Sequence, residues 1–77
     1  MNIDEFVEKF AEQMEDTDSS EITAETKFKD LPDWDSLTVL SVISMIKLDC
    51  GVSVSGLDVN KATTVTDIYE LMEKANG

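Results

Sequence analysis

The sequence predicts an all-α fold of three main helices plus one short helical turn, with a long loop between the first two helices. Three segments carry apolar residues spaced three and four apart, the period of a helix with one buried face. Of the 77 residues, 42% are apolar, which is enough for the core of one small domain spanning residues 1–77. The alternating stretch Val52-Ser53-Val54 lacks a second strand to pair with, so no sheet is expected.

The first helix is expected at residues 3–15. Asn2 precedes it as an N-cap, and Glu5, three residues later, completes the pattern of a capping box. Charged residues occupy the face opposite the apolar stripe. The apolar stripe consists of Ile3, Phe6, Val7, Phe10, Ala11 and Met14.

Residues 16–34 are rich in threonine, serine and aspartate and keep no helical period. We expect a long ordered loop, because Ile22, Phe28 and Leu31 would otherwise be exposed to water. Trp34 is expected to be a further contact between this loop and the core. Loops of this length are uncommon in small domains unless they serve a function.

The second helix is expected to begin at Asp35 or Ser36 and to end near Cys50, where Gly51 would form the C-cap. One face of this helix suits a core, and Cys50 on that face is expected to be a buried structural residue. That face consists of Val39, Val42, Ile43, Ile46 and Cys50.

A second apolar stripe lies on the other side of the same helix and comprises Leu37, Leu40, Met45 and Leu48. Two interpretations of it remain open. With Ser41, the stripe is a surface on which a partner protein docks. Alternatively, the preceding loop covers part of it through Leu31 and Trp34.

Beyond Gly51 we expect an extended segment with Val54 turned inward, and then one short helical turn at residues 57–60. The last helix should begin after Thr64 as its N-cap, with Asp67 three residues on. It is expected to end at residues 76–77. Its apolar stripe is Val65, Ile68, Tyr69 and Met72.

Composition argues against several classes of function. Seventeen acidic residues against six lysines give a net charge of −11, which disfavours binding to the phosphate backbone of nucleic acids. The chain has no histidine and one cysteine, so Ser-His triads, histidine-ligated metals and thiolate zinc sites are ruled out within it. We therefore expect neither an enzyme nor a metal site.

The sequence also favours a cytoplasmic location. A single cysteine, Cys50, cannot form an internal disulfide, which suits a reducing compartment. No apolar run reaches the length of a membrane span, and residues 1–5 lack the basic start of a signal peptide. We expect a cytoplasmic protein, monomeric, with no membrane span.

Ser36 has two interpretations. A serine that opens a helix is most often an N-cap, which accepts a backbone N–H. Alternatively, Asp35 caps the helix and leaves the Ser36 hydroxyl free for covalent modification. A phosphodiester at that position would be favoured by the partial positive charge of the helix N-terminus.

The order of elements favours the second interpretation. A helix, a long loop, the triplet Asp35-Ser36-Leu37 at the start of a second helix, a short linker and a final helix resemble the acyl carrier protein family along essentially the whole chain. Residues 25–31, Glu-Thr-Lys-Phe-Lys-Asp-Leu, resemble the family's loop ahead of the serine. Residues 62–67, Ala-Thr-Thr-Val-Thr-Asp, resemble its entry to the last helix.

The resemblance implies a small acyl-carrier-like helical bundle and a defined chemistry. Ser36 would receive 4′-phosphopantetheine from coenzyme A through a separate phosphopantetheinyl transferase. Acyl groups would then be held as thioesters on the arm and passed to acyl-transferring, ligase or synthase enzymes, while the carrier catalyses nothing itself. The resemblance also implies that the acyl chain lodges between the second and third helices.

One departure concerns charge. Members of the fatty-acid type have a strongly acidic second helix, whereas residues 36–50 here contain one acid, Asp49, and one lysine, Lys47. Residues 1–35 hold 12 acids and three lysines, a net of −9, which leaves −2 for the remainder. This distribution favours apolar docking and a specialised fatty-acid-like or polyketide-like biosynthetic pathway. A D-alanyl or peptidyl carrier and a non-carrier acidic interaction domain remain as alternatives.

Overall fold

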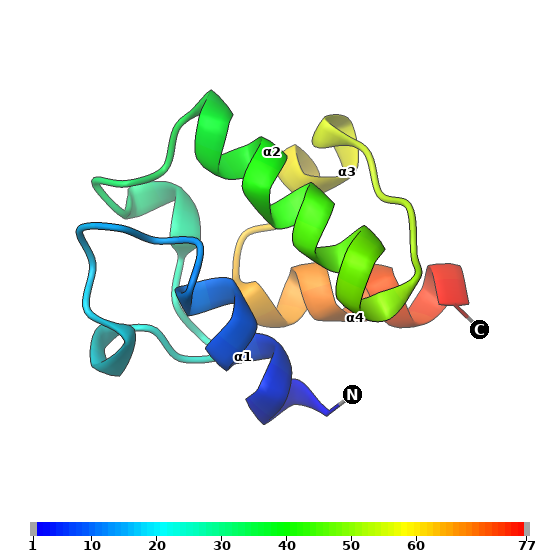
Figure 1. Ribbon diagram of the computed structural model, residues 1–77, viewed down its shortest axis with the longest axis horizontal. Coiled ribbons are helices and arrows are strands. Elements are labelled where there is room, and N and C mark those ends of the chain that lie inside the picture. The colour runs from blue at the N-terminus through cyan, green and yellow to red at the C-terminus, as the bar shows by residue number, and fades with distance from the viewer. Residues whose placement is uncertain (1, 77) are drawn as a thin grey trace.

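The computed structural model describes residues 2–76, and within that range it contains helices and loops but no strand. The all-α prediction is therefore confirmed. Figure 1 shows the course of the chain. The helices are α1 (Ile3–Ala11), α2 (Ser36–Met45), α3 (Gly56–Lys61) and α4 (Val65–Asn76), with 3₁₀ turns η1 (Ser19–Glu21) and η2 (Phe28–Asp30) and a π turn η3 (Ile46–Cys50) that continues α2.

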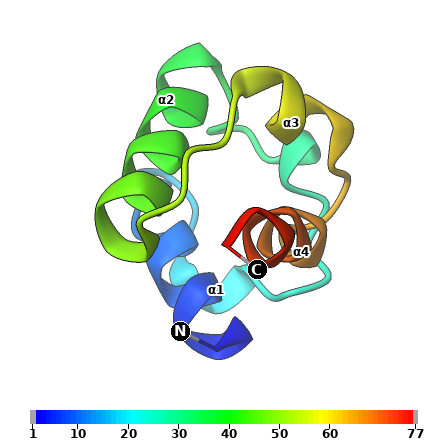
Figure 2. The same ribbon diagram turned by 90° about the vertical axis from the view of Figure 1, so that its right-hand side faces the viewer.

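The four α-helices surround a common core. Each makes its main contacts with two others, α1 with α2 and α4, and α3 with α2 and α4. Figure 2 shows this arrangement, with α2 and α3 above and α1 and α4 below. The core is closed, since its largest members have 1% or less of their surface exposed. These are Phe6, Phe10, Phe28, Val42, Ile46, Val59, Val65 and Ile68.

α1 is shorter than the predicted range of residues 3–15. Its start agrees, because the Asn2 side chain accepts the Glu5 backbone N–H at 2.9 Å. It ends at Ala11, where the backbone N–H groups of Gln13 and Met14 bond three residues back instead of four. Tightening of the last turn still leaves Met14 buried, as its place in the apolar stripe predicted.

The loop after α1 is ordered, as expected, and it is tied to the last helix. Ile22 and Phe28 are buried and Leu31 is half-buried. The Val65 N–H donates to the Thr26 carbonyl at 3.2 Å. Thr66 donates to the Ala24 carbonyl from both its backbone N–H and its hydroxyl, at 2.9 and 2.8 Å. The middle of the loop is therefore fixed by residues about 40 positions further along the chain.

α2 and its continuation η3 occupy the predicted range. The helix starts at Ser36, and η3 ends at Cys50. Gly51 is its C-cap and has φ +70°, a left-handed conformation that glycine adopts without strain. Val42 and Ile46 on the predicted core face are fully buried. The last five residues form a π turn, which the sequence pattern did not indicate.

The segment after Gly51 contains more structure than predicted. Val52 is buried and Val54 is half-buried, so Val52 rather than Val54 is the main inward contact. α3 has six residues instead of the expected four. Its start is a full capping box between Ser55 and Asp58, with both bonds at 3.1 Å.

α4 agrees with its prediction. The Thr64 hydroxyl accepts the Asp67 N–H at 3.2 Å, and the Asp67 carboxylate accepts the Thr64 N–H at 3.0 Å. Val65, Ile68 and Met72 are buried, and Tyr69 is half-buried. The predicted helix end includes Gly77, which lies outside the described residues.

Candidate functional site

Ser36 is the first residue of α2 and is exposed to solvent. The helix is capped by Asp35, whose carboxylate accepts the Thr38 N–H at 2.9 Å. The Thr38 hydroxyl donates in turn to the Asp33 carbonyl at 2.7 Å. The Ser36 hydroxyl takes no part in these bonds. Of the two interpretations of this serine, the structure agrees with the one in which Asp35 is the cap.

Asp33 fixes the chain just ahead of the cap. Asp33 is 9% exposed, and its carboxylate accepts three backbone hydrogen bonds: the Asp16 N–H donates to both oxygens at 3.2 Å, and the Thr17 N–H donates to one at 2.7 Å. A carboxylate that accepts backbone N–H groups forms charge-assisted bonds, which are shorter and stronger than neutral ones. The two ends of the long loop are therefore joined immediately before Ser36.

Trp34 fixes the same stretch of backbone through apolar contacts with the core, as expected. Its ring stacks on Phe10 of α1, with centroids 6.1 Å apart and planes at 18°. It also meets Phe28 of η2 edge-on, at 4.6 Å and 61°. Since Phe10 and Phe28 are both fully buried, the residue two positions before Ser36 is set by the core itself.

The approach to Ser36 is negatively charged. The Thr17 hydroxyl and the backbone N–H groups of Thr17 and Asp16 lower the pKa of Asp33. The Thr38 backbone N–H, followed by the Thr38 side chain, lowers the pKa of Asp35. Both carboxylates are therefore ionised at neutral pH and flank the start of α2 with negative charge.

A groove of about 500 Å³ opens beside Ser36 between α2 and α3. Its lining includes Trp34, Val39, Leu40 and Ile43 on the α2 side, and Gly56 and Asn60 on α3. A Cβ atom added at Gly56 would meet nothing within 4 Å, so the α3 wall of this groove is not tightly packed. The groove offers an apolar surface next to an exposed hydroxyl.

Most of the second apolar stripe of α2 is exposed. Leu37 is 74%, Leu40 60% and Leu48 83% exposed, so the loop does not cover them. Ser41 between them is exposed as well. Met45 was predicted to belong to this surface and does not, because it is 5% exposed and belongs to the core. It follows Val42 by three residues, which places it beside a buried position on the helix.

Cys50 lies on the predicted face but is half-buried rather than buried. Partial burial raises the pKa of its thiol.

The part of the chain that the structure describes contains no group of three or more acidic, cysteine or histidine side chains that could hold a metal ion. No helix within residues 2–76 has the length and apolar character needed to cross a membrane.

Three residues at the site were not singled out from the sequence. Asp33 has its partners 16 and 17 positions away, and nothing in the local pattern distinguishes it from the other acids of the loop. Gly56 and Asn60 line the groove from α3, whose capping box between Ser55 and Asp58 starts the helix at Gly56, one residue earlier than expected. The sequence Ser55-Gly-Leu-Asp58 is a capping-box pattern, and it was the signal available for this helix.

The sequence was compared with protein-family models and with curated proteins. No family model and no curated protein matches it. The functional evidence therefore consists of the exposed serine at the start of α2, the residues that fix it, and the two surfaces on either side of α2.

Proposed function

We propose that this chain is a stand-alone carrier protein that is modified on Ser36 with 4′-phosphopantetheine and holds acyl intermediates on that arm. The observation that supports the proposal most is the free hydroxyl of Ser36 at the solvent-exposed first position of α2, with Asp35 serving as the cap. A serine that capped the helix itself would have its oxygen engaged by a backbone N–H.

The residues present fit the arm. Ser36 supplies an exposed attachment atom, and Asp33 and Trp34 hold the preceding backbone in one position. The groove between α2 and α3 gives a mainly apolar surface directly beside the attachment point. When attached, the arm supplies a thiol that carries an acyl group as a thioester, and the protein supplies its position and its partners.

The proposal is tested by incubating the chain with coenzyme A, magnesium and a promiscuous phosphopantetheinyl transferase, followed by intact-protein mass spectrometry. We expect one added arm on the wild type and none on Ser36→Ala. Ser41→Ala is the matched control, since Ser41 is also an exposed serine of α2, and it should be modified like the wild type. An unmodified wild type, or an arm on Ser36→Ala, would contradict the proposal.

The cargo class within this proposal is an acyl group of a specialised pathway, since the neutral α2 departs from the fatty-acid type. An aminoacyl carrier shares the same serine and arm. The acyl species released from the thiol of protein purified from its natural host separates the two. A released amino acid would replace the acyl assignment and leave the carrier proposal intact.

A further inference from the structure

The two walls of the groove beside Ser36 come from elements that are held in different ways. The α2 side includes Trp34, whose ring packs on two fully buried rings of the core. The other wall belongs to α3 and includes Gly56 and Asn60. Figure 2 shows α2 and α3 as neighbours at the top of the bundle. The position of α3 relative to α2 therefore decides how wide the groove is.

α3 is a short helix that makes few contacts with the core. It has six residues, and helices of this length are marginal unless contacts outside the helix hold them. Val59 is fully buried, and Ala62 just after the helix is 3% exposed. Leu57, by contrast, is 67% exposed, and Asn60 is exposed as well. Any further contact to α3 from outside should therefore influence its position.

Such a contact comes from η2 in the long loop. The ammonium group of Lys29 donates a hydrogen bond to the backbone carbonyl of Asn60. That carbonyl lies in the last turn of α3, where carbonyl groups have no partner within the helix. A positive charge at this end is also favoured by the helix dipole. Lys29 thus satisfies the end of α3, as the capping box of Ser55 and Asp58 satisfies its start.

η2 contacts both walls of the groove through two adjacent residues. Phe28 meets Trp34 edge-on, with ring centroids 4.6 Å apart, and Lys29 binds Asn60. Phe28 is fully buried, whereas Lys29 is exposed. The contact to the α2 wall is therefore part of the core, while the contact to the α3 wall is one exposed side chain that can be released without opening the core.

We propose that Lys29 sets the width of this groove, because it holds α3 in place for a narrow apolar group and must release Asn60 before a wider group can enter. A ligand that needs the wider groove binds a less populated state, and its apparent affinity is reduced accordingly. A ligand that fits the narrow groove carries no such cost. Lys29 is in this way a specificity-determining residue. The inference goes beyond the proposed function, since it concerns the groove itself and does not depend on modification of Ser36.

The test uses two neutral alcohols with equal numbers of carbon atoms, the straight n-heptanol and the wider cyclohexylmethanol. All variants carry Ser36→Ala, so that the groove is measured with nothing attached beside it. Dissociation constants come from NMR titration of the methyl signals of Val39 and Ile43, which line the groove. We expect Lys29→Met to strengthen the binding of cyclohexylmethanol about threefold, the typical worth of a cation at a helix C-terminus, and that of n-heptanol less than about 1.5-fold.

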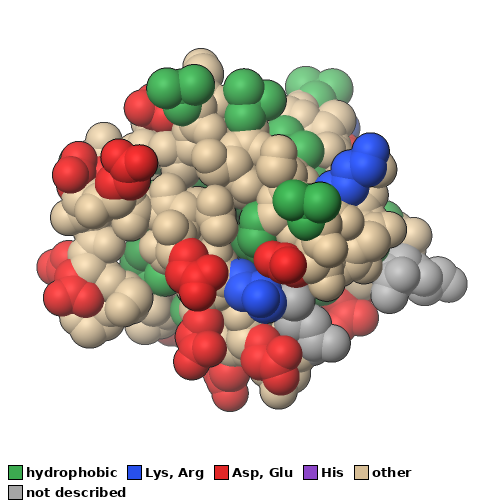
Figure 3. All heavy atoms as spheres, in the orientation of Figure 1, with side chains coloured by type: hydrophobic (Ala, Val, Ile, Leu, Met, Phe, Trp, Pro, Cys, Tyr) green, Lys and Arg blue, Asp and Glu red, His purple; other side chains and the backbone are tan. Residues whose placement is uncertain are grey.

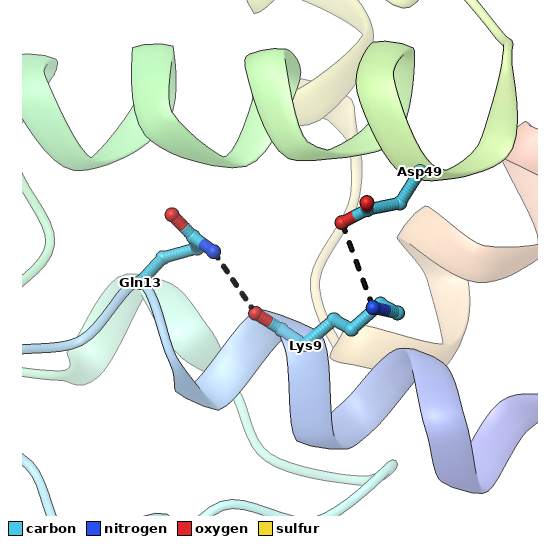
Figure 4. Close-up of polar contacts among 3 residues, drawn as sticks. All are labelled: Lys9, Gln13 and Asp49. Carbon is cyan, nitrogen blue, oxygen red and sulfur yellow. Dashed lines mark hydrogen bonds and ion pairs between the residues drawn. The ribbon is translucent and has the colours of Figure 1, made fainter.

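Three further variants serve as controls. Lys29→Arg should keep the original ratio of the two affinities, because a guanidinium also donates to a carbonyl. Charge controls are needed because acidic side chains already cover the loop and α1 (Figure 3), and the chain has a net charge of −11. Lys27→Met removes the same charge two positions away. Lys9→Met removes a lysine that joins α1 to η3 through Asp49 (Figure 4). Neither should change the ratio.

Hydrogen exchange gives a second measure of how firmly α3 is held. The N–H groups of Val59 and Ala62 donate to the carbonyls of Ser55 and Val59, both at 3.1 Å, and they exchange when α3 opens. In Lys29→Met they should exchange about threefold faster, because the same contact opposes this opening. The amides of α4 should exchange at their original rate.

Four results would overturn the proposal. They are equal changes for the two alcohols in Lys29→Met, the same change of ratio in Lys27→Met, a Lys29→Arg variant that behaves like Lys29→Met, and binding of neither alcohol. Failure of the carrier proposal is seen separately, as a wild type that gains no arm in the mass measurement, and it would leave the result on the groove unaffected.

Discussion

The start of α2 and the end of its continuation η3 are held in contrasting ways. At the start, Asp33 accepts three backbone N–H bonds and Trp34 packs on two buried rings. At the end, a π turn leads to Gly51, and the ion pair to α1 joins Lys9 and Asp49, whose side chains are 36% and 41% exposed. Charge-assisted hydrogen bonds and aromatic contacts hold the first end, whereas the second is held by the core contacts of the buried Ile46 and by a solvent-exposed ion pair.

Under the proposed function, the contrast corresponds to two different requirements, one for a site of modification and one for a docking surface. A hydroxyl that a separate enzyme is to modify has to be held in one position, because small displacements reduce the rate of transfer greatly. A docking surface tolerates adjustment of side chains when a partner binds. The end held by Asp33 and Trp34 carries Ser36, and the exposed leucine Leu48 lies in the π turn at the other end.

The largest expected effect comes from removing the aromatic contact that holds the start of α2. Phe28→Ala should lower the free energy of unfolding by about 3–5 kcal/mol, because a fully buried ring is replaced by a cavity. Leu48→Ala at the other end should change it by about 0.5 kcal/mol or less, since Leu48 is 83% exposed. Urea denaturation of both variants measures the difference, and comparable losses would show that the two ends are equally anchored.

A smaller effect is expected from Asp33→Asn, because a neutral amide accepts weaker bonds from Asp16 and Thr17 than a carboxylate does. The pKa of Asp33 is lowered by folding, so its contribution to stability is fully present above the unfolded pKa of about 3.9 and is lost as the pH falls through the folded pKa. The wild type should therefore melt higher than the variant at pH 7, and the gap should close in acid.

Asp30→Asn serves as the control for this pH dependence, because Asp30 is an exposed acid of the same loop. Thermal melts of both variants between neutral and acidic pH measure the effect. A gap for Asp33→Asn that stays constant down to low pH would show that the carboxylate charge contributes nothing to holding the start of α2.

The smallest effect is expected at the Lys9–Asp49 pair. A double-mutant cycle with Lys9→Met and Asp49→Asn should give a coupling energy of at most about 1 kcal/mol, because both side chains are substantially exposed. The coupling should shrink further as salt is added. A larger, salt-resistant coupling in urea denaturation would mean that the end of η3 is held as firmly as the start of α2.

The sequence was most informative where local pattern and burial agree. The starts of α1, α2 and α4 follow from side chains that cap the helix they precede, and Gly51 marks the end of η3. The core face of α2 was predicted from its period, with Val42 and Ile46 fully buried. Exposure of Ser36 follows from its place beside the Asp35 cap.

Features that depend on distant parts of the chain were not predictable in the same way. α1 ends at Ala11 although the apolar period continues to Met14, so tertiary contacts and not the period decide its length. Met45 is buried in the core, although its position on α2 placed it in the outer stripe. The role of Asp33 depends on loop residues that approach it only after folding. The apolar period reports which residues share a helix face, and it does not report which distant residues pack against that face.

The hydrogen bonds from Val65 and Thr66 to the loop also determine at what stage of translation the loop can adopt its folded conformation. The segment that leads to Ser36 packs against residues near the start of α4, about 40 positions downstream. A ribosome releases the chain from its first residue onward, so these contacts cannot form until α4 has begun to emerge. Under the proposed function, a transferase that recognises the folded bundle would act after translation has passed this point, and nascent chains would remain unmodified.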